Sequence, residues 1–315
     1  MPKFKIRHIT KYAYEDTVRD SANQIMLYPL NDQWQEVLQH NIVITGNPVV
    51  NIHRDYYGNE VGTFTHAHPH KELGIDSRLL VETKHRPVPE DKIEPELQWA
   101  ELEKIKLKIE YIDFLKLEKF KALPEVEKLI EGERQKKTSP LQVAIHLCEY
   151  IYKEFIYQKG VTTVETTVDE IWKLRSGVCQ DFAHILLVML RLMGIPARYV
   201  SGYVCPNKDG MRGEGATHAW VEAYIPSYGW LGLDPTNNCI ANETHVRLAV
   251  GRNFSDCSPV KGTYRGTSSH TLEVVVTVSY EDGTTSVPDQ EVQSGTITPS
   301  SRNSFRKYQE MQMQQ

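Results

Sequence analysis

The chain has 315 residues, which at roughly 150 residues per domain is enough for about two domains. Lys and Arg number 36 against 41 for Asp and Glu, giving a net charge of -5, and 40% of the residues are apolar. This balance is typical of a globular protein and lacks the cationic surplus with which duplex nucleic-acid binders neutralise phosphates, so we expect no nucleic-acid partner. The longest apolar run, 185–190, has six residues, whereas a bilayer needs about 20, and we expect no membrane partner.

The amino terminus and the cysteines indicate the cellular compartment in which the protein is expected. Residues 1–8 alternate charged and apolar side chains and lack the apolar stretch of about 7–15 residues of a secretory signal, so we expect a cytoplasmic protein. The five cysteines are odd in number, widely spaced and without a C-x-x-C pair, which disfavours a disulfide framework and a zinc ribbon. They are Cys148, Cys179, Cys205, Cys239 and Cys257, and we expect them to be reduced.

Residues 1–88 carry the signals of short strands and are predicted to form an antiparallel β-sandwich domain. The strand-like runs, separated by turn signals, are 3–14, 36–45, 49–57, 60–66 and 77–83. His66, His68 and His70 resemble a metal cluster, because alternate strand positions would place at least two imidazoles on one face. No Cys, Asp or Glu accompanies them at ligand spacing, so we predict no physiological metal. The lack of nucleotide-binding motifs predicts no cofactor.

The next segment changes to helical patterning. Residues 89–138 are rich in Lys and Glu, with apolar residues at helical spacing, which predicts a helical linker with a solvated charged face. Residues 139–256 are the expected core. It opens with a helix over 140–155, in whose apolar stripe Cys148 is expected to be buried rather than nucleophilic, and another helix is predicted over 167–174.

Cys179 opens a strongly periodic helix. Apolar side chains recur at three- and four-residue steps to position 193, and Gly194 ends the pattern. A cysteine in the first turn faces unpaired backbone N–H groups and the positive end of the helix dipole, which favour the thiolate that attacks a carbonyl. From position alone, a cysteine packed under the sheet is equally consistent. Asp181, in the same turn, is interpreted as a complement to the helix dipole.

A histidine and an aspartate follow on two predicted strands. His218 begins an alternating run to Ile225, and Asp234 ends a second run just before Pro235. In cysteine catalysis an imidazole accepts the thiol proton and delivers it to the leaving amine, while a carboxylate orients the ring. Side chains of an antiparallel pair share a face only if opposed residue numbers sum to an even value. We therefore predict either His218 opposite Asp234, with a loop over 223–229, or a β-bulge.

Several strings give the sequence a specific resemblance to a known family. They are Ser-Gly-Val-Cys-Gln-Asp-Phe-Ala-His at 176–184, and the runs 194–203, 217–222 and 229–237, with further likeness at 55–59, 247–254 and 262–266. The chain resembles the bacterial transglutaminase-like superfamily, whose members are described as cysteine proteases. The resemblance implies an α+β fold: a papain-like core, with a helix-borne Cys against an antiparallel sheet, and an N-terminal antiparallel β-sandwich domain. It implies Cys179 as nucleophile, His218 as general base and acid, and Asp234 as the orienting carboxylate.

The resemblance also implies an oxyanion hole, built from the backbone N–H of the nucleophile and a donor upstream. Tyr157 and Trp172 are candidates for that donor, with core packing as the competing interpretation, and the backbone N–H of Gln180 is a further candidate. Trp220 shares the face of His218 and either shields the pair, walls the acyl site or simply packs.

Three functions stay open at this point. The first is a cysteine peptidase or amidase acting on a peptide or protein amide, the second is a transglutaminase, and the third is a binding protein with a vestigial triad. The Gly-rich loop 207–216 is a candidate cover for the site. Residues 257–298 are predicted to return as strands to the N-terminal β domain, and 299–315 to form a flexible tail.

Overall fold

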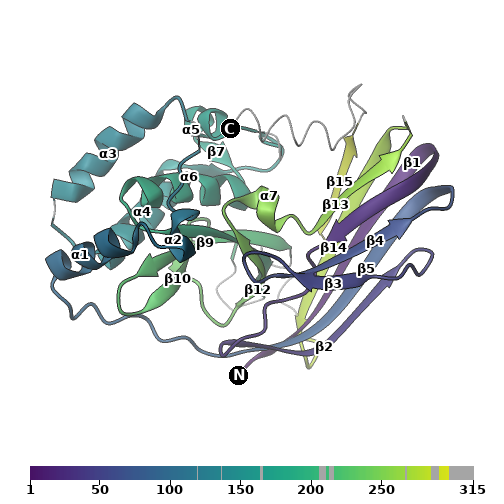
Figure 1. The fold of residues 1–315 in the computed structure, drawn as a ribbon, viewed down its shortest axis with the longest axis horizontal. Helices are drawn as coiled ribbons and strands as arrows, with labels where there is room; N and C mark the ends of the chain where they lie inside the picture. Colours follow the sequence, from purple (N-terminus) through teal and green to yellow (C-terminus); the bar gives the residue numbers. More distant parts are fainter. Residues whose placement is uncertain are drawn as a thin grey trace.

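The computed structural model describes residues 1–118, 120–135, 137–163, 166–205, 211–212, 216–266, 268–284 and 291–297, with the backbone alone for 135 and 291–297. A large curled antiparallel sheet, drawn at the right of Figure 1, packs beside a mixed core of helices and a smaller sheet. The α+β fold expected from the sequence is confirmed. Most of the loop 207–216 and the tail 299–315 lie outside the described residues.

The curled sheet is organised around one long strand, β1 (Lys3–Ile25). Its other strands are β2 (Gln35–Ile44), β3 (Asn51–Arg54), β4 (Glu60–His66), β5 (His70–Thr83), β13 (Val260–Arg265), β14 (His270–Tyr280) and β15 (Glu291–Ile297). The first half of β1 lies between β5 and β14, and the second half between β4 and β13. The pairing with β5 shifts register between Ala13 and Val18, and Asp20 adopts a positive φ of 51°. This irregularity bends β1 from one half of the sheet into the other.

The strand predicted over 3–14 is therefore 23 residues long. The carboxy-terminal strand β14 pairs with β1 from Phe4↔Tyr280 to Tyr14↔His270, so it lies in the amino-terminal sheet. The domain boundaries given above stay predictions.

The histidine cluster spans the turn between two strands rather than lying along one strand. His66 ends β4 and His70 begins β5, with Pro69 between them, so the expected alternate strand positions are wrong. Pro69 removes a backbone donor and favours a turn over a continuous strand. Both ring nitrogens of His70 have partners, the His68 carbonyl at 2.8 Å and the Ser21 hydroxyl at 3.4 Å.

The helices are α1 (Pro95–Ile105), α2 (Ile109–Ile112), α3 (Leu123–Gln135), α4 (Pro140–Glu154), α5 (Val168–Leu174), α6 (Cys179–Leu192) and α7 (Phe254–Cys257). The Ser139 hydroxyl accepts a hydrogen bond from the Gln142 amide at 3.2 Å, which caps α4. In the linker region the helical period breaks after Ile105, and Leu107 and Ile109 are exposed although their spacing suggested a buried stripe. Among the described residues, no helix combines the length and apolar character that crossing a bilayer requires.

The core sheet has the order β11-β10-β9-β8-β12. Its strands are β8 (Ala197–Val204), β9 (Thr217–Ile225), β10 (Gly229–Asp234), β11 (Cys239–Ile240) and β12 (His245–Gly251). One face of β9, with Ala219, Val221 and Ala223, packs in the same apolar cluster as α6. The alternate residues point to the other face, because side chains of a strand alternate. That face carries His218, Trp220 and Glu222.

Two buried side-chain amides join the curled sheet to the edge of β12. The Asn59 amide exchanges hydrogen bonds of 2.8 Å with both backbone groups of Val250. The Gln35 amide does the same with Arg247, at 2.8 and 2.9 Å. Each amide therefore pairs with the strand edge as a neighbouring strand would, which fixes the two parts of the molecule against one another.

The hairpin between β9 and β10 has a register that neither sequence-based alternative described. Ile225 pairs with Gly229 and Val221 with Leu233, so opposed residue numbers sum to 454, an even value, with no register shift. Pro226 and Ser227 lie in a tight turn closed by the Tyr228 amide donating to the Ile225 carbonyl at 3.1 Å. Ser227 has a φ of 63°, as a type II turn requires at its third residue. His218 and Asp234 share a face, although the predicted seven-residue loop was wrong.

Candidate active site

The start of α6 is shaped by contacts of Asp181. Its carboxylate accepts hydrogen bonds from the Val178 amide at 2.7 Å and the Thr162 hydroxyl at 2.6 Å. A Cβ on Gly177 would overlap this carboxylate, so a glycine is needed where the chain enters the helix. Cys179 is the first residue of α6 and is half-buried, which leaves part of its side chain accessible.

A buried imidazole and carboxylate lie at the end of the neighbouring hairpin. His218 Nε2 is 2.8 Å from Asp234 Oδ2, and neither side chain has any exposed surface. Because a carboxylate only accepts hydrogen bonds, Nε2 carries a proton and donates it. The other ring nitrogen, Nδ1, is buried and has no hydrogen-bond partner within standard geometry.

The interactions of His218 set its charge. Burial alone would lower its pKa, but the charge of Asp234, the proximity of Cys179 and the hydrogen bond to Asp234 raise the pKa to about 10. For Asp234, burial is outweighed by His218 and His245, and its pKa lies well below the usual range. The imidazolium is therefore the favoured form at neutral pH, between a buried carboxylate and the sulfur of Cys179.

Asp234 is held by five hydrogen bonds. Oδ1 accepts from the backbone amides of Thr236 at 2.9 Å and Asn237 at 3.3 Å. Oδ2 accepts from His218, from the Asn237 side chain at 2.7 Å and from His245 Nε2 at 3.3 Å. Sequence reasoning missed His245 and Asn237. Asn237, in the string at 229–237, had a local signal, since a side-chain amide three residues after an aspartate can fold back onto it.

Trp220 packs directly behind His218. The two rings are stacked at 6.1 Å between centroids and 27° between planes, and Trp220 is fully buried. A Cβ on Gly202 would lie 2.6 Å from the Trp220 ring, and one on Gly232 would lie 3.5 Å from its Nε1. Gly202 on the flanking strand β8 thus makes room for the indole, whereas the distance from Gly232 is that of an ordinary contact.

The oxyanion candidates differ in position. Gln180 follows Cys179 in the first turn of α6, where backbone N–H groups lack intrahelical partners. Tyr157 is half-buried in β6 (Ile156–Tyr157) and pairs with Gly177 of β7 (Ser176–Gly177). Burial, followed by Cys179, raises the pKa of Tyr157 to about 12, so the phenol is neutral and near the thiol.

Trp172, the remaining candidate for an oxyanion-hole donor, has its indole N–H engaged elsewhere. Its indole N–H donates to Glu125 at 2.8 Å, and the Arg175 guanidinium lies 3.5 Å from its ring centroid. His184, from the same motif as Cys179, accepts a hydrogen bond from the Phe254 amide at 3.2 Å and packs beside Tyr199. Both residues serve the packing around the helices.

One group of metal-ligand type exists within the described ranges. Ligand atoms of Asp234, Cys239 and His245 lie within 4.8 Å of one another. Burial, with Asp234 second, raises the pKa of Cys239 to about 12, so its thiol is protonated at neutral pH. A metal here would also compete with His218 for Asp234 Oδ2. The chemistry of these groups therefore favours a hydrogen-bonded arrangement over a resident metal.

Comparison with known proteins places the sequence in a family. Residues 127–235 match the transglutaminase-like superfamily, and residues 4–82 match the bacterial transglutaminase-like N-terminal region. An uncharacterized protein of Mycobacterium leprae is 32% identical over 288 residues, covering 89% of this chain and 99% of the relative. A protein-glutamine gamma-glutamyltransferase of Pseudomonas aeruginosa is 28% identical over 179 residues, 54% of this chain and 25% of that protein.

The fold has a match among solved structures. A "putative cysteine protease" from Cytophaga hutchinsonii superposes with a TM-score of 0.68 at 20% identity, covering 96% of this chain and 93% of that one. This likeness concerns the fold. The two matched regions and the relatives establish that the chain belongs to the transglutaminase-like superfamily and carries the bacterial N-terminal region ahead of its core.

Proposed function

We propose that the protein is a thiol-dependent amide-bond enzyme in which Cys179, His218 and Asp234 form a catalytic triad. One observation supports this above the others. A buried imidazole is fixed through Nε2 to a carboxylate 2.8 Å away, while its Nδ1 has no hydrogen bond and is close enough to Cys179 for the sulfur to raise the pKa of the ring. Most buried polar side-chain atoms have a hydrogen-bond partner, so an unpaired Nδ1 close to a thiol favours a role in proton transfer.

The proposed reaction begins from a pair of Cys179 thiolate and His218 imidazolium, because the raised pKa of His218 favours the proton on Nδ1. The thiolate forms a bond to the carbonyl carbon of a peptide or protein amide. Asp234 stabilises the imidazolium and fixes the ring. Collapse of the tetrahedral intermediate breaks the C–N bond, and the Nδ1 proton leaves with the amine. Cys179 then carries the acyl group as a thioester.

The second half of the reaction restores the enzyme. In hydrolysis, water gives a proton to His218 Nδ1 and its oxygen attacks the thioester carbonyl. The C–S bond then breaks, the pair of Cys179 thiolate and His218 imidazolium is restored, and the product leaves as a carboxylic acid. The backbone N–H groups at the start of α6, including that of Gln180, and the phenol of Tyr157 are the proposed donors to the oxyanion of each tetrahedral state. Hydrolysis makes the protein a cysteine peptidase or amidase.

Amine transfer is the second candidate. The relative from Pseudomonas aeruginosa is named a protein-glutamine gamma-glutamyltransferase, and transfer differs from hydrolysis only in that an amine replaces water at the thioester. The triad serves either nucleophile. A binding protein with an unused triad is the third candidate, against which the open Nδ1 beside the thiol argues.

Three activity readouts and one alkylation measurement test these alternatives. Purified protein is incubated with a glutamine-containing protein such as casein, and released ammonia, new amino termini and incorporation of a fluorescent primary amine are followed. New termini or amine-independent ammonia support hydrolysis, whereas incorporation of the amine supports transfer. A Cys179→Ala variant must lose whichever activity is seen. If neither activity nor Cys179-specific alkylation exceeds that of free cysteine, the binding-protein alternative replaces the proposal.

A further inference from the structure

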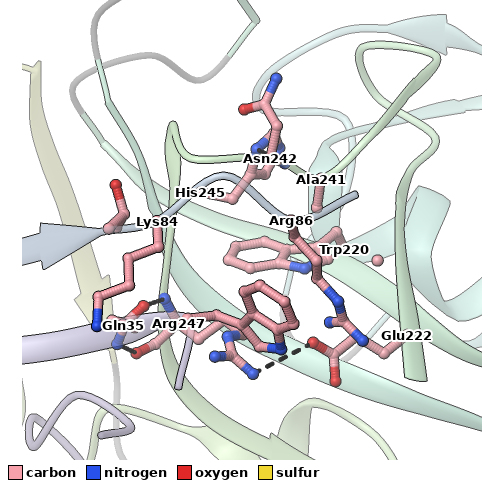
Figure 2. A pocket seen from close by; sticks show the side chains of 12 residues that line it. Gln35, Lys84, Arg86, Trp220, Glu222, Ala241, Asn242, His245 and Arg247 are labelled. Atoms are coloured by element: carbon pink, nitrogen blue, oxygen red, sulfur yellow. Dashed lines mark hydrogen bonds and ion pairs between the residues drawn. The ribbon is translucent and has the colours of Figure 1, made fainter. Parts of the chain in front are cut away.

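A small polar pocket lies behind Trp220, where the curled sheet meets the core sheet (Figure 2). Its volume is about 40 Å³. Lys84 and Arg86 enter from the segment after β5, and Trp220 and Arg247 from β9 and β12. A buried water needs about 10–15 Å³ of such space, so the pocket has room for a small ion with one or two waters but is too small for a phosphate ester or a peptide.

Two nitrogen donors of this pocket have no partner. Arg86 Nε and Trp220 Nε1 are both buried, both belong to side chains that line the cavity, and neither makes a hydrogen bond. The remainder of the Arg86 guanidinium is fixed, with Nη2 donating to the Trp230 carbonyl and the group 5.0 Å from the Tyr228 ring centroid. An unpaired buried N–H costs about 1–3 kcal/mol, so two at one cavity point to an acceptor between them.

The charges around the pocket favour an anionic acceptor. Glu222 is its buried carboxylate, and Arg198 at 2.6 Å and Arg247 at 3.7 Å balance it. Arg247 also pairs with Asp32 at 2.6 Å.

Lys84 and Arg86 add two positive charges to the lining of the pocket. Within the part of the chain that the structure describes, neither forms an ion pair with a carboxylate within 4.0 Å, although the charge of Arg86 contributes to the lowered pKa of Glu222. The guanidinium and ammonium groups around the pocket thus exceed the carboxylates by two positive charges. Coulomb attraction for an anion is strong at such a half-buried position.

We propose that this pocket binds one small monovalent anion of the size of chloride, held by Arg86 Nε and the Trp220 indole N–H. The anion would join the amino-terminal sheet, through Arg86, to the ring that stacks on His218 at 6.1 Å. Binding itself does not depend on the proposed function, whereas its effect on turnover rests on it. We expect chloride to stabilise the fold and to hold the His218 ring in place.

The experiment compares chloride with gluconate, which is too large for the pocket, at constant ionic strength. For a specific site, each ten-fold rise in chloride above its dissociation constant raises Tm by about 2 °C or more. Crystals grown in bromide should show an anomalous peak between Arg86 Nε and Trp220 Nε1. Equal Tm values in both salts, or a crystal with ordered water alone in the pocket, would overturn the proposal.

Variants connect the effect to the two donors. Trp220→Phe keeps an aromatic ring and removes the N–H, and Arg86→Gln removes one positive charge. Both should lose the chloride-dependent rise in Tm, while the control Arg78→Gln, whose guanidinium pairs with Asp76 at 2.8 Å on the curled sheet, should keep it. If Arg86→Gln does not fold, Trp220→Phe and the bromide crystal still decide the question. A full chloride response in Trp220→Phe would refute the assignment.

Discussion

His245 Nε2 donates a hydrogen bond to Asp234 Oδ2 over 3.3 Å, on the same oxygen that receives His218. The tautomer follows from the other nitrogen, since Nδ1 lies 3.3 Å from the Asn242 backbone N–H, which can only donate. His245 is nearly fully buried and packs edge-on against Trp220 at 5.2 Å. It is therefore a positioning residue, which acts through the orientation of Asp234.

Loss of His245 is predicted to lower both stability and turnover. A buried hydrogen bond to a charged group contributes about 1.5–3 kcal/mol, so His245→Ala should reduce the free energy of unfolding by roughly this amount. Turnover should fall with little change in KM, because His245 is nearly fully buried and acts through Asp234. His245→Gln, which keeps a donor near the same position, should recover part of kcat. Recovery of stability without recovery of kcat would show that His245 is only structural.

The pH dependence should follow His218. Its pKa is raised to about 10, so the imidazolium stabilises the fold fully below pH 6.5, and this stabilisation is lost as the pH rises toward 10. We expect kcat/KM to fall on an alkaline limb over the same range, because the imidazolium is the acid that protonates the leaving amine. Asp234 is the largest cause that raises this pKa, so Asp234→Asn should shift the limb to lower pH and reduce kcat/KM by roughly 10²–10⁴-fold.

A matched control separates the effect of losing the Asp234 carboxylate from that of a general loss of negative charge. Asp76→Asn removes a carboxylate whose partners, Arg7 and Arg78, lie on the curled sheet. The alkaline limb should be unchanged in this variant. An unshifted limb in Asp234→Asn would mean that His218 does not control the profile.

The sequence predicted which residues carry the proposed chemistry and in what order, but it did not predict the geometry between them. Parity placed His218 and Asp234 on one face, because strand alternation leaves only two choices. The actual register depended on the turn, where Ser227 adopts a positive φ that serine does not signal. His245 lies on β12, which pairs with β8 rather than with its neighbours in sequence, so its proximity to Asp234 is a tertiary contact without a local pattern.

The lack of a local sequence pattern for tertiary contacts also explains two other features that the sequence did not predict. The bend in β1 comes from an irregular pairing with β5 and β13, and single-strand patterning cannot show where a partner changes. The unpaired nitrogens of Arg86 and Trp220 result from two chain segments meeting, which a sequence does not display.

Selective alkylation provides a test of the nucleophile. Cys148, Cys205 and Cys257 are buried, and Cys239 is half-buried with a pKa raised to about 12, so iodoacetamide at pH 7 should modify Cys179 first. Mass spectrometry should find one adduct in the folded protein and none at early times in Cys179→Ser. Cys239→Ser is the matched control and should label as the parent does. Rapid labelling of Cys239 instead would contradict the assignment.

Gly202 is predicted to tolerate no side chain, because its place in the sheet is what gives Trp220 its position behind His218. A Cβ there would overlap the Val246 carbonyl oxygen and lie 2.6 Å from the indole, and a backbone group in a paired strand cannot move aside as a flexible side chain would. Gly202→Ala should lower the free energy of unfolding by about 3 kcal/mol, at the upper end for overpacking, and should disturb the Trp220 fluorescence.

Gly132→Ala in α3 is the matched control: nothing lies within 4 Å of its Cβ position. Because alanine favours the helix there by about 0.5–1 kcal/mol, that variant should unfold at a higher denaturant concentration than the parent. If both variants are equally stable, the indole is not held by close contact with the strand, and Trp220 would have room to move away from His218.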